Sequence, residues 1–208
     1  MAKQRTLVVV GTGTATGVPD QCVLHISLNG IGATPAETLD ICSAAASGAI
    51  SAMVGAGISR DDIRTVNVSV QDYFDQAQQR VTSRVGSYQL EVIVRSLDRV
   101  SQTLAVLFEA AGTALQIRSL QLSMRDTQPL RRAARREAVR DAQERAQDLA
   151  EAAGLRLGEI IVLEDNDRSG SQGVRAMAAS RNAEVSMPVE PGQVSVSASV
   201  TITYAIAD

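Results

Sequence analysis

Aromatic side chains are scarce in this chain of 208 residues: they make up 2% of the sequence, and tryptophan is absent. The interior must therefore be built from aliphatic side chains and alanine, which favours close packing of helices on a sheet. The same scarcity removes the stacking platforms on which single-stranded nucleic acids or sugars bind. Because the formal net charge is −3, we also expect no nucleic-acid partner and no general attraction to anionic membranes.

Histidine and cysteine are almost absent as well, with one histidine and two cysteines. A hydrolytic triad would need His25 beside a nucleophile and an orienting carboxylate, and its sequence neighbours supply no such set, so we predict a surface or interface side chain. Cys22 and Cys42 fall on apolar faces of a predicted strand and a predicted helix, which indicates two buried thiols; a disulfide between them is the alternative. These residues cannot supply the usual zinc ligands, so we expect no metal and no cofactor.

Long apolar runs are missing too: no stretch reaches the ~18–20 consecutive apolar residues of a transmembrane helix. Lys3 and Arg5 precede an apolar run, but residues 7–10 are fewer than the ~7–15 of a signal-peptide core. A strand that begins this close to Met1 predicts a cytoplasmic protein. Export is the alternative if a leader was removed from the native sequence.

What the sequence does contain is a regular series of strand and helix patterns in the order ββαββαβαββ. The predicted strands are 5–14, 22–29, 63–71, 85–95, 115–124, 157–163 and 194–206, and the predicted helices are 35–55, 97–111 and 129–153. Thr34, Pro35 and Glu37 form a capping box that begins the first helix. Short links between consecutive strands demand antiparallel pairing, so we predict a single α+β domain over residues 1–208, with three main helices packed on antiparallel sheet.

Two of the predicted helices have a face of apolar or small residues. In the first helix this face comprises Leu39, Cys42, Ala46, Ala49, Ile50 and Met53. In the third it comprises Ala134, Ala138, Ala142, Ala146, Leu149 and Ala153. Small side chains would let the third helix lie close to a sheet.

Two motifs resemble ligand loops but depart from them. Gly11, Gly13 and Gly17 have the third glycine one place late for a dinucleotide fingerprint, and a strand follows instead of a helix, so we predict a turn. The segment 165–170 matches the first half of a calcium loop, but the twelfth position is Ala176 where a bidentate glutamate is required, so we predict a solvated turn.

Four arginines gather at the start of the third helix: Arg131, Arg132, Arg135 and Arg136. Cations are slightly unfavourable near a helix N-terminus, so the cluster needs an explanation. We expect solvated or subunit-contacting side chains, helped further along by Arg140–Glu144 and Asp141–Arg145 pairs; a binding patch for another protein or an acidic ligand is the alternative.

The C-terminal third combines a long polar excursion with a regular final strand. Residues 164–193 are rich in glycine, serine and alanine and show no period, which is typical of a functional or mobile loop. The final strand alternates strictly, and we expect it to pair on both edges, with one partner strand from either the same chain or another subunit. Its candidate interface residues are Val194, Val196, Val200, Ile202 and Tyr204.

Several segments together resemble the SIMPL domain family, also called DUF541 or the periplasmic-immunogenic-protein-like family. They are 10–13 with 18–20 near the start, 146–158 at the end of the third helix, and 188–202 near the end. The resemblance covers essentially the whole chain. It implies no agreed biochemical activity, since similar proteins include bacterial envelope antigens and proteins linked to oxidative-stress tolerance. For some relatives it also implies large ring-like or cage-like homo-oligomers.

Three functions stay open on these grounds. We favour a non-enzymatic protein that assembles with itself into a ring or cage, with a scaffolding or stress-related role. The alternative is an adaptor that binds another protein through the Arg131–Arg136 cluster or the 164–193 segment. The third is an enzyme whose site the sequence does not reveal, because no constellation supplies nucleophile, base and oxyanion donors together.

Overall fold

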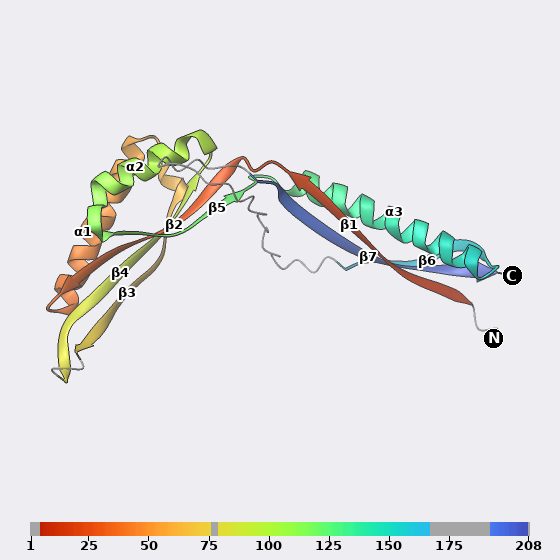
Figure 1. Ribbon diagram of the computed structural model, residues 1–208, viewed down its shortest axis with the longest axis horizontal. Coiled ribbons are helices and arrows are strands. Elements are labelled where there is room, and N and C mark those ends of the chain that lie inside the picture. Colours follow the sequence, from red (N-terminus) through yellow and green to blue (C-terminus); the bar gives the residue numbers. More distant parts are fainter. Residues whose placement is uncertain (1–4, 76–78, 167–191, 208) are drawn as a thin grey trace, which may run out of the picture. The chain divides into compact units, whose positions relative to one another are not determined.

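The computed structural model describes residues 5–75, 79–166 and 192–207 (Figure 1). Its helices and strands, besides three short 3-10 turns, are β1 (Thr6–Gly17), β2 (Gln21–Gly32), α1 (Pro35–Gly55), β3 (Ile63–Asp75), β4 (Arg80–Val94), α2 (Val100–Ala111), β5 (Leu115–Ser123), α3 (Gln128–Ala152), β6 (Arg156–Asp165) and β7 (Val194–Ala207). The predicted order ββαββαβαββ and the α+β class are confirmed.

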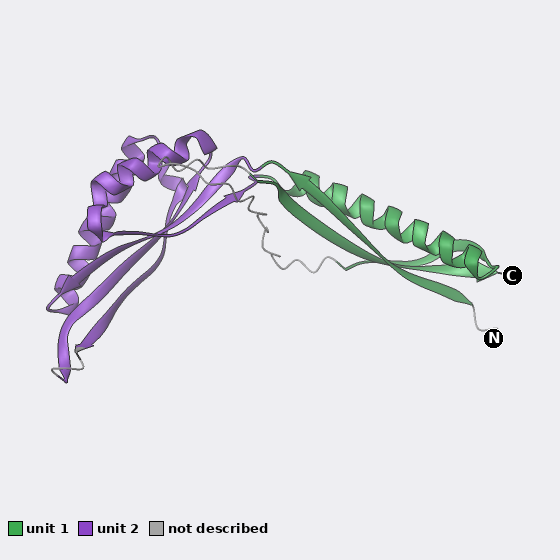
Figure 2. Cartoon of the chain, viewed as in Figure 1, with its two compact units in different colours: residues 1–18, 126–179, 192–208 green, residues 19–125, 180–191 purple. Residues whose placement is uncertain are grey.

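The chain divides into two compact units, each with its own antiparallel sheet (Figure 2). Unit 1 contains β1, α3, β6 and β7, with strand order β1-β7-β6. Unit 2 contains β2, α1, β3, β4, α2 and β5, with strand order β3-β4-β2-β5. Strands β1 and β2 are consecutive in sequence but belong to different sheets, so the chain crosses between the units after β1. Whether both units fold together as one domain over residues 1–208, as we expect, stays a prediction.

The core of unit 2 follows from the alternation of β2. Cys22, Leu24, Ile26 and Leu28 are all fully buried on one face, as predicted, and pack with apolar residues of α1 and α2. Both cysteines are buried free thiols, which confirms the prediction and leaves the alternative disulfide unformed.

Helix α1 begins at the predicted capping box. The Thr34 hydroxyl accepts a hydrogen bond from the Glu37 backbone N–H, and the Glu37 carboxylate accepts one from Ala33 N–H at 2.9 Å. By length and composition α1 is the one described helix that could cross a membrane, yet one stripe of it lies in the core of unit 2. The buried stripe starts at Thr38, one position before the predicted Leu39, which is 40% exposed.

A glycine pair lets α1 lie close to the sheet of unit 2. Gly30 of β2 is paired with Gly86 of β4, and the Cys42 sulfur of α1 lies over both. A Cβ on Gly86 would come within 2.6 Å of that sulfur. The second helix, α2, follows a short 3-10 turn, and Ser96 at the start of that turn makes no capping hydrogen bond.

Two glycines of β1 likewise allow α3 to lie close to the sheet of unit 1. A Cβ on Gly11 would lie 2.1 Å from the backbone oxygen of Ala138, and one on Gly13 would lie 2.2 Å from that of Ala134. The predicted turn at these glycines is therefore wrong. Both glycines lie within strand β1. Glycine is required at these positions because only a residue without a side chain leaves room for the backbone of α3.

The small-residue face of α3 is confirmed for four alanines and corrected at its end. Ala134, Ala138, Ala142 and Ala146 are fully buried, and Ala150 continues the series. Leu149 is 52% exposed, and Ala153 is exposed as well. The buried series keeps a spacing of four residues, which turns gradually around the axis of a helix with about 3.6 residues per turn.

Strand β7 is the central strand of unit 1 and pairs on both edges, with β1 on one side and β6 on the other. Both partners belong to the same chain, which confirms pairing on both edges; a subunit contact through this strand stays a prediction. Of its candidate interface residues, Val194, Val200, Ile202 and Tyr204 are buried and Val196 is half-buried. Val200, Ile202 and Tyr204 belong to the core that β7 shares with β1 and α3. Because β7 is central, the free edges of this sheet are those of β1 and β6 among the described strands.

The polar excursion is described only at its ends. β6 continues through Asp165, and β7 begins at Val194. The rest of the predicted calcium-like segment, from Asp167 onward, and most of the 164–193 segment lie outside the described residues.

Candidate functional site

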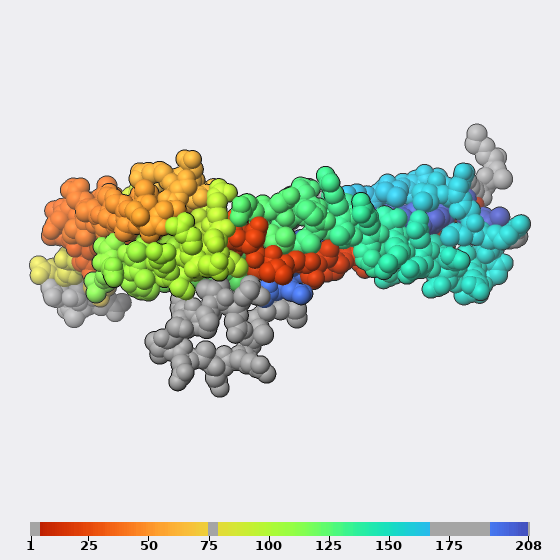
Figure 3. Space-filling view, turned by 90° about the horizontal axis from the view of Figure 1, so that it is seen from above, coloured from red at the N-terminus to blue at the C-terminus, as the bar shows by residue number. Residues whose placement is uncertain are grey.

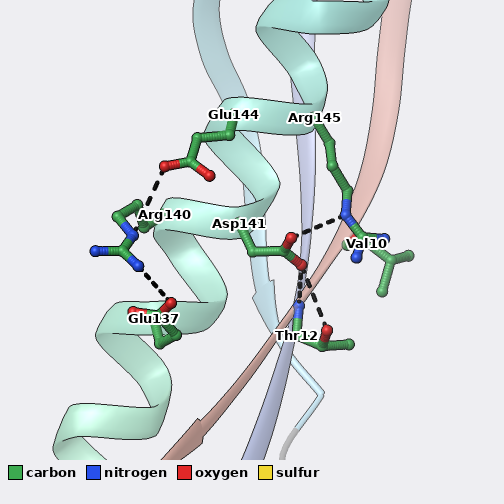
Figure 4. A network of polar contacts seen from close by, with 7 residues as sticks. All are labelled: Val10, Thr12, Glu137, Arg140, Asp141, Glu144 and Arg145. Carbon is green, nitrogen blue, oxygen red and sulfur yellow. Dashed lines mark hydrogen bonds and ion pairs between the residues drawn. The ribbon is translucent and has the colours of Figure 1, made fainter.

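The outer edge of β1 is covered by an acidic side chain of α3 (Figure 4). The backbone N–H of Thr12 donates a hydrogen bond to the Asp141 carboxylate at 2.8 Å, and the Thr12 hydroxyl lies 3.4 Å from the same oxygen. The hydrogen bond from Thr12 N–H, helped by the Arg145 guanidinium, holds the pKa of Asp141 below its usual range.

Arg145 completes this cover of the β1 edge. Its Nε donates to the other Asp141 oxygen at 3.0 Å, and its Nη1 donates to the backbone oxygen of Val10 at 3.3 Å. Val10 C=O and Thr12 N–H are two residues apart and point to the same side, so they are the groups that a strand added in parallel would bond. The Asp141–Arg145 pair therefore occupies the place of an added strand at this point, which is one way that proteins protect sheet edges.

The opposite edge of unit 1, β6, exposes apolar side chains instead. Ile160, Ile161, Val162 and Leu163 are successive residues, with 43%, 40%, 43% and 51% of their surfaces exposed. Successive side chains of a strand point to opposite faces, so these four are divided between the two faces of the sheet; two irregularities in the pairing of β6 with β7 shift the alternation locally. The surface of this strand is visible in cyan in Figure 3. A run of exposed aliphatic residues on an edge strand is typical of a site that pairs with another chain.

Unit 2 also has an edge strand with exposed apolar residues. β3 lies at the end of its sheet, and it exposes Val66, Val68, Tyr73 and Phe74. Neither edge could be predicted from the sequence, because the exposure of an apolar strand depends on which strands and helices lie beside it in the fold.

The arginine cluster at the start of α3 is only partly engaged. Arg135 Nε lies 3.0 Å from an Asp165 oxygen of β6. Arg132 and Arg136 are exposed, and neither has a hydrogen bond or ion pair within the described residues. The Nε of Arg131 is buried and bonded to no other described group. Both predicted pairs further along the helix are confirmed, Arg140–Glu144 at 3.7 Å and Asp141–Arg145 at 3.0 Å.

The single histidine lies in a row of polar residues on the sheet face of unit 2 opposite the helices. Across the sheet, His25 is paired with Glu91 on β4 and with Ser119 on β5. Its Nδ1 is 3.9 Å from a Glu91 oxygen, and Glu91 also binds Arg64 at 2.9 Å. Within the described residues no hydrogen bond joins His25 to Ser119, so the row lacks the nucleophile–base contact of a hydrolytic triad.

The described residues give no evidence for a metal-binding site or for a reactive cysteine. Those residues hold no cluster of three or more potential metal ligands. Burial raises the pKa of the Cys22 thiol to about 11 and also raises that of Cys42, which disfavours the reactive thiolate form.

Comparison with known proteins identifies the family of this chain. A family model described as "SIMPL: Protein of unknown function (DUF541)" matches residues 7–204. The chain belongs to the SIMPL family. Since the match runs from β1 to β7, the family includes both units.

The SIMPL relatives found by sequence comparison include two bacterial antigens. The "26 kDa periplasmic immunogenic protein" of Brucella melitensis biotype 1 is 26% identical over 216 residues, which cover 96% of this chain and 84% of the relative. The protein of the same name from Brucella abortus strain S19 is similar to the same extent.

Proposed function

We propose that this chain is a non-enzymatic building block that assembles with itself into a ring-like or cage-like homo-oligomer. The observation that carries the proposal is the exposed aliphatic run of residues 160–163 on the edge strand β6. Pairing that edge with another copy would satisfy its backbone groups and bury these side chains together. The other edge of the same sheet is protected by Asp141 and Arg145, so assembly uses β6 and not β1.

Charge favours a head-to-tail contact over a symmetric one. An antiparallel pairing of two β6 strands centred between Ile161 and Val162 would place Glu159 opposite Glu164, and like charges in that position are unfavourable. The β3 edge of unit 2, with its exposed Val68 and Tyr73, is the apolar edge available on a second copy. A contact from β6 of one copy to β3 of the next is heterologous, and such contacts close into rings when the rotation allows it.

Two charged substitutions test this contact when molar mass is measured by size-exclusion chromatography with light scattering. Val162→Lys in β6 and Val68→Lys in β3 should each yield monomers, whereas Leu149→Lys, on an exposed position of α3, should assemble like the wild type. An equimolar mixture of the first two variants should stop at a dimer, because only one intact pair of edges remains. A monomeric wild type would refute assembly, and a Val68→Lys variant that assembles normally would refute the head-to-tail arrangement.

The periplasmic names of the relatives favour the exported alternative over our cytoplasmic prediction. We include in the proposal that the assembly works outside the cytoplasm as a scaffold linked to stress tolerance. Fractionation of the native host, followed by peroxide challenge of a deletion strain, tests both parts. A cytoplasmic protein whose loss leaves peroxide survival unchanged would contradict them.

A second candidate function, the adaptor, is favoured by Arg132 and Arg136, which are exposed and unpaired within the described residues. A partner with an acidic surface could bind both guanidinium groups. The double variant Arg132→Glu/Arg136→Glu should then lose a co-purifying protein while its molar mass stays unchanged. If the variant still co-purifies with that protein, Arg132 and Arg136 are solvated side chains and the adaptor function is refuted for this cluster.

A further inference from the structure

Helices α1 and α2 cover one face of the unit 2 sheet and leave the other face open (Figure 1). A groove lined mainly by strand residues lies on the open face, and its larger part also reaches Ile41 of α1. Two hollows, of about 240 Å³ and about 750 Å³, adjoin each other along it and share Gln89 of β4 and Arg118 of β5. Apart from Val66 of the β3 edge, none of the residues that line these hollows is among those named for the proposed assembly.

Two β-bulges shape the smaller hollow. On β5 the register passes from Ile117 to Ser119, so Arg118 is the extra residue, and on β3 it passes from Thr65 to Asn67, so Val66 is the extra one. Both bulges lie at the level of the Ile26–Leu90 pair, on opposite sides of the two central strands. Arg118 and Val66 thereby line the same hollow, and bulges often serve to redirect a side chain toward a site.

Amide and hydroxyl groups dominate the lining of the larger hollow. Its polar residues are Asn29, Ser69, Gln71, Ser87, Gln89, Thr113, Gln116 and Arg118. No aspartate or glutamate lines either hollow among the described residues. The Arg118 guanidinium is exposed and has no hydrogen bond or ion pair within the described chain. An unpaired cation surrounded by neutral hydrogen-bonding groups is suited to one anionic group on a polar ligand.

Two hydroxyl groups on this face lack partners. Ser27 is fully buried, and its Oγ is bonded to no other described group. Ser27 is paired in the sheet with Gln89 and Gln116, which line the groove. The Ser87 Oγ is likewise buried and unpartnered, and Ser87 itself lines the larger hollow. Buried polar groups normally have a partner, so the Ser87 hydroxyl, in the lining of the larger hollow, is a group that a ligand in the groove would bond, whereas Ser27 lies beneath the lining.

We propose that this groove binds a short peptide with a free C-terminal carboxylate. Arg118 bonds the carboxylate, and the side-chain amides of Gln89 and Gln116 bond peptide groups, since each carboxamide both donates and accepts. Ile31 and Val85, in the same hollow, contact an aliphatic side chain of the peptide. A sugar acid would share the carboxylate chemistry, but no phenylalanine, tyrosine or tryptophan, the side chains on which sugars usually stack, lines either hollow among the described residues.

Fluorescence anisotropy with full-length protein and the probe fluorescein-Gly-Ser-Ala-Val tests the proposal. The probe with a free carboxylate should bind at least tenfold more tightly than the same probe with a C-terminal amide. Arg118→Gln should abolish that difference, and Arg132→Gln, which removes another exposed and unpaired guanidinium, should preserve it. Light scattering of Arg118→Gln should match the wild type, which shows that the variant folds and keeps any assembly intact.

Three results would overturn the proposal. One is no binding of the carboxylate probe at millimolar protein. Another is equal affinity of the wild type and Arg118→Gln for it. The third is displacement of the probe by glucuronate as effective as displacement by unlabelled Gly-Ser-Ala-Val, which would indicate a general site for organic acids.

Discussion

Gly11 lies so close to Ala138 that a Cβ on the glycine would stand 2.1 Å from the alanine backbone oxygen. A contact this short joins backbone to backbone, so no side-chain rotation can relieve it. The position of α3 over β1 therefore depends on two residues of β1, Gly11 and Gly13, that have no side chain.

Gly11→Ala and Gly13→Ala should each lower the free energy of unfolding by about 3 kcal/mol or more, because α3 must move away from its sheet. Gly48→Ala is the matched control: it lies within α1, and its Cβ would be 4.0 Å from the nearest atom, Ala110 O. It should raise stability by about 0.5–1 kcal/mol. Urea unfolding at fixed protein concentration measures all three. Losses below about 1 kcal/mol for both β1 variants would contradict the close packing.

Asp141→Ala should expose the edge of β1, because Thr12 N–H loses its acceptor and Arg145 loses its ion pair. We expect lower stability at neutral pH and faster amide exchange at Thr12 than in the wild type. Asp148→Ala, an exposed position on the same helix, should change neither.

The effect of Asp141 should also depend on pH, with a definite sign. Its pKa is lowered in the folded protein, so its stabilisation is complete above the unfolded pKa of about 3.9 and is lost as pH falls through the folded value. Chemical unfolding of the wild type and Asp141→Ala should therefore differ at pH 7 and converge at strongly acidic pH. A difference that stays constant with pH would show that the carboxylate charge has no part.

Tyr204→Phe should stabilise the protein by up to about 1 kcal/mol, because it removes a buried hydroxyl that has no partner. Tyr88→Phe should have the opposite sign, since the Tyr88 hydroxyl is hydrogen-bonded to the Thr65 hydroxyl at 3.2 Å. Thermal unfolding of the two variants compares them directly. A loss of stability for Tyr204→Phe would mean that its hydroxyl has a partner after all.

Cys22 should make stability depend on alkaline pH. Its pKa is raised by burial from near 9 to about 11, so folding favours the thiol. The contribution is complete below about pH 9 and declines by about 1.4 kcal/mol for each pH unit between about 9 and about 11. The wild type should therefore lose more stability than Cys22→Ala between pH 8 and pH 10.5. Parallel losses would place the titration at another group.

Local patterns predicted the order of elements well, because caps and alternation act over a few residues. The capping box at Thr34 and the buried face of β2 needed no tertiary information. The turn expected at Gly11 was wrong, since a glycine that makes room for a helix more than 100 residues away looks locally like a glycine that makes a turn. The pairing of β1 with β7 joins the two ends of the chain and leaves no local signal.

The candidate sites were harder to predict from the sequence than the order of helices and strands. The Asp141–Arg145 pair was predicted from its spacing of four residues, but its bonds to Val10 and Thr12 depend on where α3 lies. Residues of the final strand were expected at an interface because alternation cannot distinguish an edge strand from a central one. Arg118 gave no sequence signal at all, because its position follows from a bulge in the register of β5.

The most direct test of the account is amide hydrogen exchange of β6 as a function of protein concentration. Assembly through this edge predicts that backbone amides in residues 160–163 exchange more slowly at high concentration, while Thr12 in β1 exchanges at the same rate throughout. Exchange in β6 that does not change with concentration, together with increasing protection of β1, would contradict it.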